Sequence, residues 1–561
     1  MFISFFRTFY LLIHYIIFKE ACQILYFAVL NAKNGMECHF FSFGNGVSKL
    51  PSYHLETPFP YDNIFIMKNK DIEFLRTERL QNYWENYARS FEPPFSRWGF
   101  LIEFLVRIFR NTAIALEGLC GRNIYVKKAD SDFDRIPPRF HSLVNLLGQE
   151  GILKQVLFPK PISDWPRIPA LNLKFGNGAS ASGYALDWDM AATKAVAELL
   201  EWSAFGGHEK KNFIFGTWND LKSKGAVDPK RFIAFSEKQL VEPEYAGHRI
   251  NDGSKFSWTR CFSLFDGKEY WAPAQLVFFG SEIFSGEPKI RQTTTNGGAA
   301  GTSITIALVH GLLEAIERDA LMIHWLNKIT PPRVDLESLA EFNNENINKI
   351  LGEYKKYDID FTLLDITTDL EVPVFLTVIR DQIPGRPAVF LGAGADLDAE
   401  SAIIHSLLEG LRAGYWRDVS EEQIAEVNKK APLIENLEER RAYWCDKSRM
   451  PEADFLLNGP MKKIKRNEFC GADNQKKLER LKQILRARGM EAYGVDCTTK
   501  AAEDVGLKII MTLVPELYYL YLNERFKYLG SKRLYEAPVK MGVFKQPKKE
   551  EEMNSIPHPM L

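Results

Sequence analysis

The chain has 561 residues, enough for several domains or for one large domain with an accessory region. Charged residues make up 25% of it and hydrophobic residues 46%, which is typical of soluble globular proteins. Because 71 basic residues balance 72 acidic ones, the formal net charge of -1 does not favour nucleic acid or an acidic membrane as a partner. The 7 cysteines are widely spaced, which fits a reducing cytoplasm better than a disulfide framework or a zinc knuckle.

The N-terminal part of the chain combines apolar runs with a helical pattern. Residues Thr8–Phe18 are apolar, but the run is far shorter than the roughly 20 residues that span a bilayer. Three interpretations stay open: a packed or upstream-translated segment with initiation near Met36, a membrane-surface helix, and a secretion signal. We predict a mainly helical accessory region over residues 1–136, of which 1–35 are upstream-translated under the first interpretation.

A mixed pattern of helices and strands follows over residues 137–561. Four short apolar runs predict buried strands: IDFTLLDIT, VPVFLTVIRD, AVFLGAGAD and LKIIMTLV. Long helical patterns lie among them. The predicted fold class is therefore α+β, with mixed sheets and packed helices.

Three of the predicted helices carry charged residues along the edge of an apolar face. Residues three or four apart share one face of a helix. The aligned residues are Glu198 and Glu201 in the first helix, Glu314 and Glu317 in the second, and His405, Glu409 and Arg412 in the third. A single pair of this kind is typical of a solvated surface. If the three helices converge, however, the carboxylates repel one another and need cations, and oxygen ligands suit Mg²⁺ bridging to a nucleotide.

A loop of small residues precedes each of the first two helices. The loops are GNGASASG (Gly176–Gly183) and NGGAAG (Asn296–Gly301), and neither has the Gly-Lys-Ser/Thr ending of a Walker loop. Small residues let main-chain N–H groups approach a phosphate, and the N-terminus of the following helix favours negative charge. A phosphate-binding loop and a simple tight connection are both compatible with the pattern.

Taken together, these segments resemble the YcaO-domain proteins, which are ATP-dependent enzymes acting on peptide backbone amides. TNGGAAG…HGLLEAIERDA resembles their signature, while SGYALDWDMAATKAVAELLEW and AIIHSLLEGLRA resemble their first and third motifs. VDCTTKAAEDVGLKIIMTLVPEL resembles a late strand region, and Pro557-His558-Pro559 resembles the proline-rich C-terminus of azoline-forming members. The resemblance covers residues 137–561 and implies a YcaO-like catalytic domain around an ATP cleft, with a proline-rich C-terminal tail.

The resemblance also implies roles for individual residues. Magnesium ions would be held by Glu198, Glu201, Glu314 and Glu317. The nucleotide would be contacted by Ser182, Ala299, Thr302, Arg318, His405, Glu409 and Arg412. Proton transfer near the amide would involve the tail residues Pro557, His558, Pro559 and Leu561. We expect the free terminal carboxylate to manage this proton, with His558 as an added acid/base group of near-neutral pKa. A disordered tail is the other interpretation.

Some positions depart from the family pattern. Ile306 stands in place of a glutamate, and His405 and Trp202 each stand in place of an arginine. Arg412, two turns beyond His405, is our candidate for the missing charge. The chain also ends in Met560-Leu561 without a final proline. These departures leave open a degenerate, non-enzymatic scaffold that binds peptides.

The expected activity is cyclodehydration of a ribosomal precursor peptide, as in bacteriocin-like natural products. A Cys, Ser or Thr side chain of the substrate attacks the preceding carbonyl, ATP phosphorylates the oxyanion, and loss of phosphate gives a thiazoline or oxazoline. The enzyme then needs no nucleophile of its own. Thioamide or amidine formation is the alternative chemistry.

The expected cofactors are ATP and Mg²⁺, and the expected location is the cytoplasm. The expected partners are the precursor peptide and a leader-binding protein resembling ubiquitin-activating enzymes, without nucleic acid. Residues 1–136 would dock such a partner or be a remnant of one. A homodimer is a further expectation.

Overall fold

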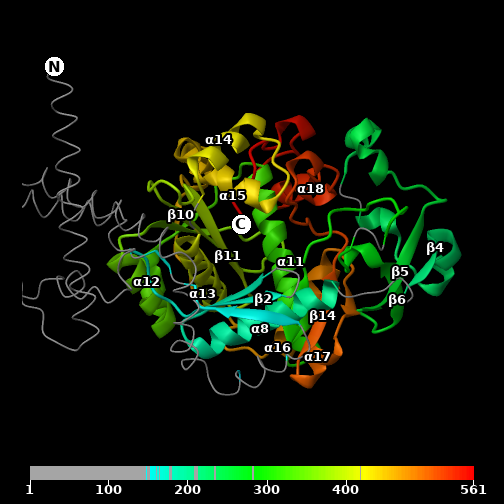
Figure 1. Ribbon diagram of the computed structural model, residues 1–561, viewed down its shortest axis with the longest axis horizontal. Coiled ribbons are helices and arrows are strands. Elements are labelled where there is room, and N and C mark those ends of the chain that lie inside the picture. The colour runs from blue at the N-terminus through cyan, green and yellow to red at the C-terminus, as the bar shows by residue number, and fades with distance from the viewer. Residues whose placement is uncertain are drawn as a thin grey trace, which may run out of the picture. The chain divides into compact units, whose positions relative to one another are not determined.

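The computed structural model describes residues 140, 147, 152–159, 161–162, 164–175, 180–206, 213–232, 235–280, 284–416 and 419–560. All of them belong to the unit Met67–Leu561. They form mixed sheets with packed helices, which confirms the α+β class (Figure 1). The predicted accessory region, residues 1–136, lies outside the described residues. Within the described part, no helix is both long enough and apolar enough to cross a membrane.

Three sheets carry the described helices. The first is antiparallel and consists of β1 (Leu153–Leu157), β2 (Ala170–Phe175) and β3 (Ser180–Tyr184). The second has the order β11-β10-β9-β8-β12, with β8 (Arg333–Val334), β9 (Asp360–Asp365), β10 (Val374–Arg380), β11 (Val389–Ala395) and β12 (Met461–Lys462). The third has the order β4-β5-β13-β14-β7, and β6 also pairs with β5. Its strands are β4 (Ile214–Thr217), β5 (Lys255–Ser263), β6 (Glu269–Pro273), β7 (Gly298–Gly301), β13 (Tyr493–Asp496) and β14 (Lys508–Leu513).

The four apolar runs in the sequence form β9, β10, β11 and β14, as predicted. Every residue of β11 is buried, and so is every residue of β10 except Arg380. Strands that are covered on both faces have continuous rather than alternating apolar runs, which explains why these segments stand out in the sequence.

Three helices position the predicted site residues, namely α8 (Trp188–Gly206), α11 (Ile304–Leu326) and α13 (Ala399–Gly410). α8 packs on β2, β3 and β7, and α13 packs on β10 and β11. α11 contacts β7 and β14 of one sheet and β10 and β11 of another, so it lies between two sheets (Figure 1). The remaining helices are α9 (Trp218–Leu221), α10 (Glu237–Val241), α12 (Glu345–Lys356), α14 (Glu421–Lys430), α15 (Leu437–Cys445), α16 (Asn474–Ala487), α17 (Lys500–Asp504) and α18 (Lys532–Lys540).

The central helix α11 begins at a capping serine and carries one fully buried ion pair. The Ser303 hydroxyl accepts the N–H of Ile306 at 3.3 Å, which satisfies one of the free donors of the first turn. Further along, Asp319 is completely buried and pairs with Arg533 of α18 at 2.7 Å. It also accepts the N–H of Tyr518 at 2.8 Å. Removing one partner of such a pair costs about 3–5 kcal/mol, so Asp319 holds α11 and α18 together.

The C-terminal tail is packed between α11 and α15 rather than disordered. The indole N–H of Trp325 in α11 donates to the carbonyl of Ile556 at 2.9 Å, and that of Trp444 in α15 donates to the carbonyl of Pro557 at 3.2 Å. Pro557 through Met560 are all buried. Leu561, the last predicted tail residue, lies outside the described residues.

The environment of His558 differs from the predicted one. Its side chain is fully buried, and its Nε2 lies 2.7 Å from the carbonyl oxygen of Tyr521. Burial, together with the nearby charge of Arg440, lowers the pKa of His558 well below its usual value. The near-neutral pKa that we predicted is therefore wrong, because a buried imidazole beside a cation disfavours its charged form.

This burial predicts that His558 makes the protein sensitive to acid. Below about pH 6.5 the imidazole of the unfolded chain takes up a proton that the folded chain does not bind. The free energy of unfolding therefore falls by about 1.4 kcal/mol for each unit by which the pH is lowered. We expect His558→Gln, whose amide can still donate to the carbonyl of Tyr521, to flatten this dependence. The measurement is the midpoint of denaturant unfolding at pH values between 5 and 7. Equal slopes for both proteins would mean that His558 has the same pKa in the folded and unfolded chain.

Candidate functional site

Five glutamates from α8, α11 and α13 form one electrostatic cluster. Glu198, Glu314 and Glu409 interact electrostatically in all three possible pairs. Glu201 feels the charges of Glu314 and Glu198. Glu317 feels those of Glu409 and Glu314. The structure thus brings together carboxylates that lie more than 200 positions apart in the sequence.

Main-chain N–H groups of neighbouring strands orient these carboxylates. The N–H of Ser182 donates to Glu198 at 2.9 Å, and that of Gly297 donates to Glu314 at 3.1 Å. The N–H of Ala300 donates to Glu201 at 2.6 Å, and that of Ala393 donates to Glu409 at 2.8 Å. The main chain of Ala395 hydrogen-bonds to Glu317 in the same way. The small-residue loops were candidates for binding phosphate directly. Their N–H groups at Ser182, Gly297 and Ala300 instead hold carboxylates.

Glycines allow the strands to come this close to the helices. Gly297 has a φ of +89°, a conformation that other residues rarely adopt. A Cβ atom at Gly311 of α11 would lie 2.5 Å from the carbonyl oxygen of Gly297. A Cβ atom at Gly183 would lie 1.9 Å from the carbonyl oxygen of Ala191 in α8. The glycines of the two loops are therefore needed for packing that brings N–H donors to the glutamates.

Burial makes the negative charge of this cluster unfavourable. It is the largest cause that raises the pKa values of Glu198, Glu201 and Glu314. It also raises the pKa of Glu317 to about 8, although Arg318 opposes this. Raised carboxylate pKa values in a group of side chains identify a place where added cations would be strongly favoured.

Two arginines supply part of the missing positive charge. Arg318 pairs with Glu317 at 2.6 Å and lies 3.6 Å from Glu314. Arg412 pairs with Glu409 at 3.0 Å, and its guanidinium lies 5.3 Å from the ring centre of Tyr184. Five carboxylates against two guanidinium groups leave a net negative charge, so the chain itself does not neutralise the cluster.

The donor set fits magnesium that arrives together with a phosphate ligand. In the described part of the chain, no three His, Cys, Asp or Glu side chains lie close enough to hold a metal ion by themselves. Mg²⁺ is usually held by one or two carboxylates, water and substrate phosphates rather than by a complete protein cage. Half-buried glutamates with raised pKa values match that requirement.

Other predicted residues surround the cluster. Ala299 lies in β7 opposite Ile510, and Thr302 is exposed just before α11. The charge of Arg318 acts on the imidazole of His558 in the tail. Trp202, which replaces an arginine, hydrogen-bonds to Glu198 and stacks on Phe279 with ring centres 5.1 Å apart. The indole thus keeps a donor on Glu198 where the arginine would have been.

The sequence interpretation missed one cationic residue near the cluster. Lys194 is not among the predicted site residues, and its i,i+4 spacing to Glu198 is also compatible with an ordinary surface pair. In the structure it is half-buried, and the nearest charges acting on it are those of Glu409, Arg412 and Asp187. The available signal was its place one turn before Glu198, where the other two site helices carry His310 and His405.

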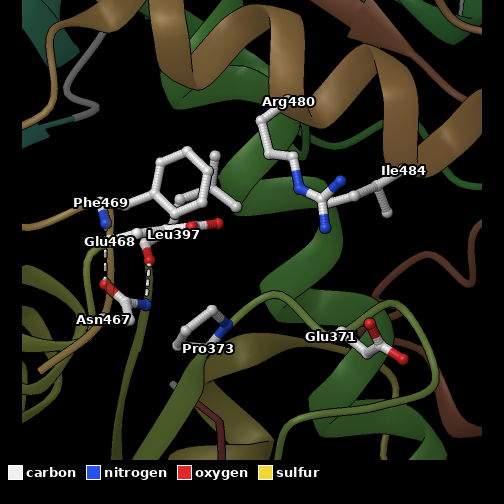
Figure 2. A pocket seen from close by; sticks show the side chains of 8 residues that line it. All are labelled: Glu371, Pro373, Leu397, Asn467, Glu468, Phe469, Arg480 and Ile484. Atoms are coloured by element: carbon white, nitrogen blue, oxygen red, sulfur yellow. Dashed lines mark hydrogen bonds between the residues drawn. The ribbon is translucent and has the colours of Figure 1, made fainter. Parts of the chain in front are cut away.

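A cavity of about 260 Å³ elsewhere in the described part of the chain has none of the predicted site residues in its lining. Figure 2 shows Arg480 and Ile484 of α16 facing Glu371 and Pro373 from the connection between β9 and β10. Asn467 anchors one side, because its amide donates to the carbonyl of Leu397 at 2.6 Å (Figure 2). With one cation and two acids among its lining residues, this cavity does not have the charge of the glutamate cluster.

The sequence matches a known family over most of the described region. The profile described as YcaO cyclodehydratase, ATP- and Mg²⁺-binding, matches residues 182–518. The chain belongs to the YcaO family, which confirms the resemblance found in its motifs. All five clustered glutamates lie within the matched residues.

Two relatives share part of this chain. An uncharacterized protein of Methanothermobacter thermautotrophicus is 29% identical over 268 residues, which are 47% of this chain and 66% of the relative. An uncharacterized protein in the tfuA 3' region of Rhizobium leguminosarum bv. trifolii is 27% identical over 240 residues, 41% of this chain and 54% of the relative. The matches thus span about two thirds of one relative and about half of the other.

Solved structures show a similar fold. A heterocyclase in complex with substrate and cofactor superposes with a TM-score of 0.59 at 22% identity, covering 73% of this chain and 55% of the heterocyclase. YcaO from Methanopyrus kandleri, bound with AMPPCP and Mg²⁺, gives a TM-score of 0.48 at 17% identity, covering 68% and 89% of the two chains. At its level of identity, the heterocyclase supports the fold assignment alone.

The raised pKa of Glu317 predicts a loss of stability in mild base. Its folded pKa of about 8 exceeds the ordinary value of 4.5, so the folded state holds a proton that the unfolded state has lost between these values. Stability of the metal-free protein should therefore fall as pH rises from 5 to 8, and Glu317→Gln should reduce that fall. Thermal unfolding in a chelating buffer, measured from pH 5 to 8, gives the fall in stability for the unaltered protein and for the variant. An unchanged slope in the variant would show that Glu317 is ionised throughout.

Proposed function

We propose that this chain is an ATP-dependent enzyme that activates peptide backbone amides and cyclodehydrates Cys, Ser or Thr residues of a ribosomal precursor peptide to thiazolines or oxazolines. The observation that carries the proposal is the cluster of five buried or half-buried glutamates from three helices, which the two arginines beside it do not balance. Membership in the YcaO family, described as ATP- and Mg²⁺-binding, supports the same assignment. The heterocyclase with a similar fold is described as bound to substrate and cofactor.

The glutamates and arginines have distinct roles in this proposal. Magnesium is assigned to Glu198, Glu201, Glu314 and Glu317, and the main-chain donors described above fix the direction of each carboxylate. Nucleotide contacts are assigned to Ser182, Ala299, Thr302, Arg318, His405, Glu409 and Arg412. Arg318, held in place by Glu317, would offset the negative charge of the phosphates. When bound, ATP supplies the phosphoryl group that turns an amide oxygen into a leaving group.

The protein itself needs to supply little covalent chemistry. The nucleophile is the side chain of the substrate peptide, so the protein mainly orients the amide and excludes water. Proton transfer is assigned to the C-terminal tail, which the Trp325 and Trp444 indoles hold in place. Because His558 is buried and neutral, its proposed contribution is to position the tail residues on either side of it, Pro557 and Pro559, while Leu561 keeps its assignment to the proton-transfer residues.

Recognition of the precursor is assigned to a second protein. A leader-binding partner resembling ubiquitin-activating enzymes would deliver the peptide, and residues 1–136 are the segment proposed to meet it. A thioamide or amidine product is the alternative outcome of the same amide activation. Mass spectrometry of the co-expressed precursor separates these outcomes, because each azoline loses one water and each thioamide gains mass by exchanging oxygen for sulfur.

Glu314 provides a direct test of the proposed activity. Its carboxylate is oriented by Gly297 and lies near Arg318, so Glu314→Ala should lower peptide-dependent phosphate release by about a hundredfold or more. The matched control is Glu426→Ala, because Glu426 is an exposed glutamate of α14 paired with Lys429. The assay uses the full chain with its precursor and leader-binding partner.

Each result of this assay has a defined meaning. Equal rates for the unaltered protein and Glu314→Ala would remove Glu314 from the reaction. No phosphate release by the unaltered protein with its precursor and partner would favour a peptide-binding scaffold over an enzyme.

A further inference from the structure

The three site helices repeat one pattern of charged residues. Each carries a basic residue, then a glutamate four positions later, then another charged residue three positions after that. The sets are Lys194, Glu198 and Glu201 in α8; His310, Glu314 and Glu317 in α11; and His405 and Glu409 in α13, with Arg412 in the 3₁₀ turn Leu411–Tyr415 that follows it. Four residues are about one helical turn, or roughly 6 Å along the axis. The pattern therefore places a layer of basic residues one turn before the carboxylates.

The three residues of this layer are close enough to interact electrostatically. The charges of Lys194 and His310 both lower the pKa of His405. The charge of Lys194 also acts on His310. All three pairwise interactions within the layer are thus present, as they are among Glu198, Glu314 and Glu409. The register of the helices has therefore aligned a basic layer beside an acidic one.

Only one residue of the basic layer carries a permanent charge. Burial lowers the pKa of His310, and it lowers that of His405 to about 4, so both imidazoles are neutral at neutral pH. The other charges acting on them are those of Lys477 and Asp396, which pair with each other at 2.7 Å, and that of Glu409. Both rings are nevertheless accessible to solvent. Lys194 is consequently the cation of this layer.

The ammonium group of Lys194 has no direct partner in the described part of the chain. It is half-buried and makes no hydrogen bond or ion pair there, while the charge of Glu409 favours its protonated form and that of Arg412 opposes it. A partly buried ammonium without a partner is unfavourable, because lost hydration is not replaced. A bound anion would replace that hydration.

We propose that Lys194 is a phosphate-contacting residue and that the basic layer receives one phosphate group of the bound triphosphate. This inference rests on the proposed nucleotide site. Arg318 lies eight residues after His310 on α11, about 12 Å along the helix, so cations flank the carboxylate layer on both sides. With metal held at the carboxylates, one phosphate would contact Arg318 and another would contact Lys194, beside the imidazoles of His310 and His405.

Binding of a non-hydrolysable ATP analogue with Mg²⁺, measured by calorimetry on the full chain, tests this assignment. Lys194→Met keeps the aliphatic stem but removes the charge, and we expect it to weaken binding about tenfold or more. Lys194→Arg restores a phosphate donor and should bind within about threefold of the unaltered chain. Lys349→Met, which removes an exposed lysine of α12, is the control for loss of general positive charge and should not change binding.

Adenosine without phosphates separates a phosphate contact from structural damage. Lys194→Met should change adenosine binding less than about twofold, and its unfolding temperature should match that of Lys349→Met. Unchanged binding of the analogue by Lys194→Met, or an equal loss for analogue and adenosine, would overturn the phosphate contact while leaving the nucleotide site intact. If the unaltered chain binds no analogue with Mg²⁺, the proposed function fails and this inference fails with it.

Discussion

The structure depends on holding several like charges close together in a partly buried place. Carboxylates that repel one another stay in position because a main-chain N–H of an adjacent strand binds each of them. These donors reach the helices only because glycines remove the Cβ atoms that would block the approach, as at Gly297 and Gly311. The small residues of the loops, the close strand–helix packing and the electrostatics of the site are thus one arrangement. A larger side chain in either loop would separate the donors from their carboxylates.

The helix α11 shows how structural and functional acids differ when they are close in sequence. Asp319 is more deeply buried than Glu314, yet Arg533 and the N–H of Tyr518 satisfy it completely within the chain. Burial raises the pKa values of all three acids, but Glu314 and Glu317 share the single cation Arg318. Burial alone therefore does not identify a functional acid. The distinguishing property is negative charge that the surrounding chain leaves without enough positive charge.

The sequence predicted the parts of this protein that local periodicity controls. The apolar runs of β9, β10, β11 and β14 and the glutamate stripes of α8 and α11 follow from the spacing of residues on single elements. Contacts between distant segments were not predictable in this way. The neutral state of His558 depends on packing against Arg440 and Tyr521, and the partners of the loop N–H groups depend on which helix each strand meets. Lys194 was missing from the predicted site for the same reason, since the charges of Glu409 and Arg412 that act on it come from a distant segment of the chain.

The departures from the family pattern bear on whether this chain is an active enzyme or a scaffold that binds peptides. Trp202 keeps a neutral hydrogen-bond donor on Glu198, and Arg412 places a charged guanidinium on Glu409. A scaffold that binds no nucleotide would gain stability if cationic or neutral side chains removed the unfavourable charge of these glutamates. Each unit by which a carboxyl pKa is raised means that the folded chain disfavours the ionised form by about 1.4 kcal/mol. This chain has instead kept the orienting N–H groups and left the carboxylates with too few cations. That combination is unfavourable for a protein that binds no cation and favourable for one that binds metal with a phosphate ligand.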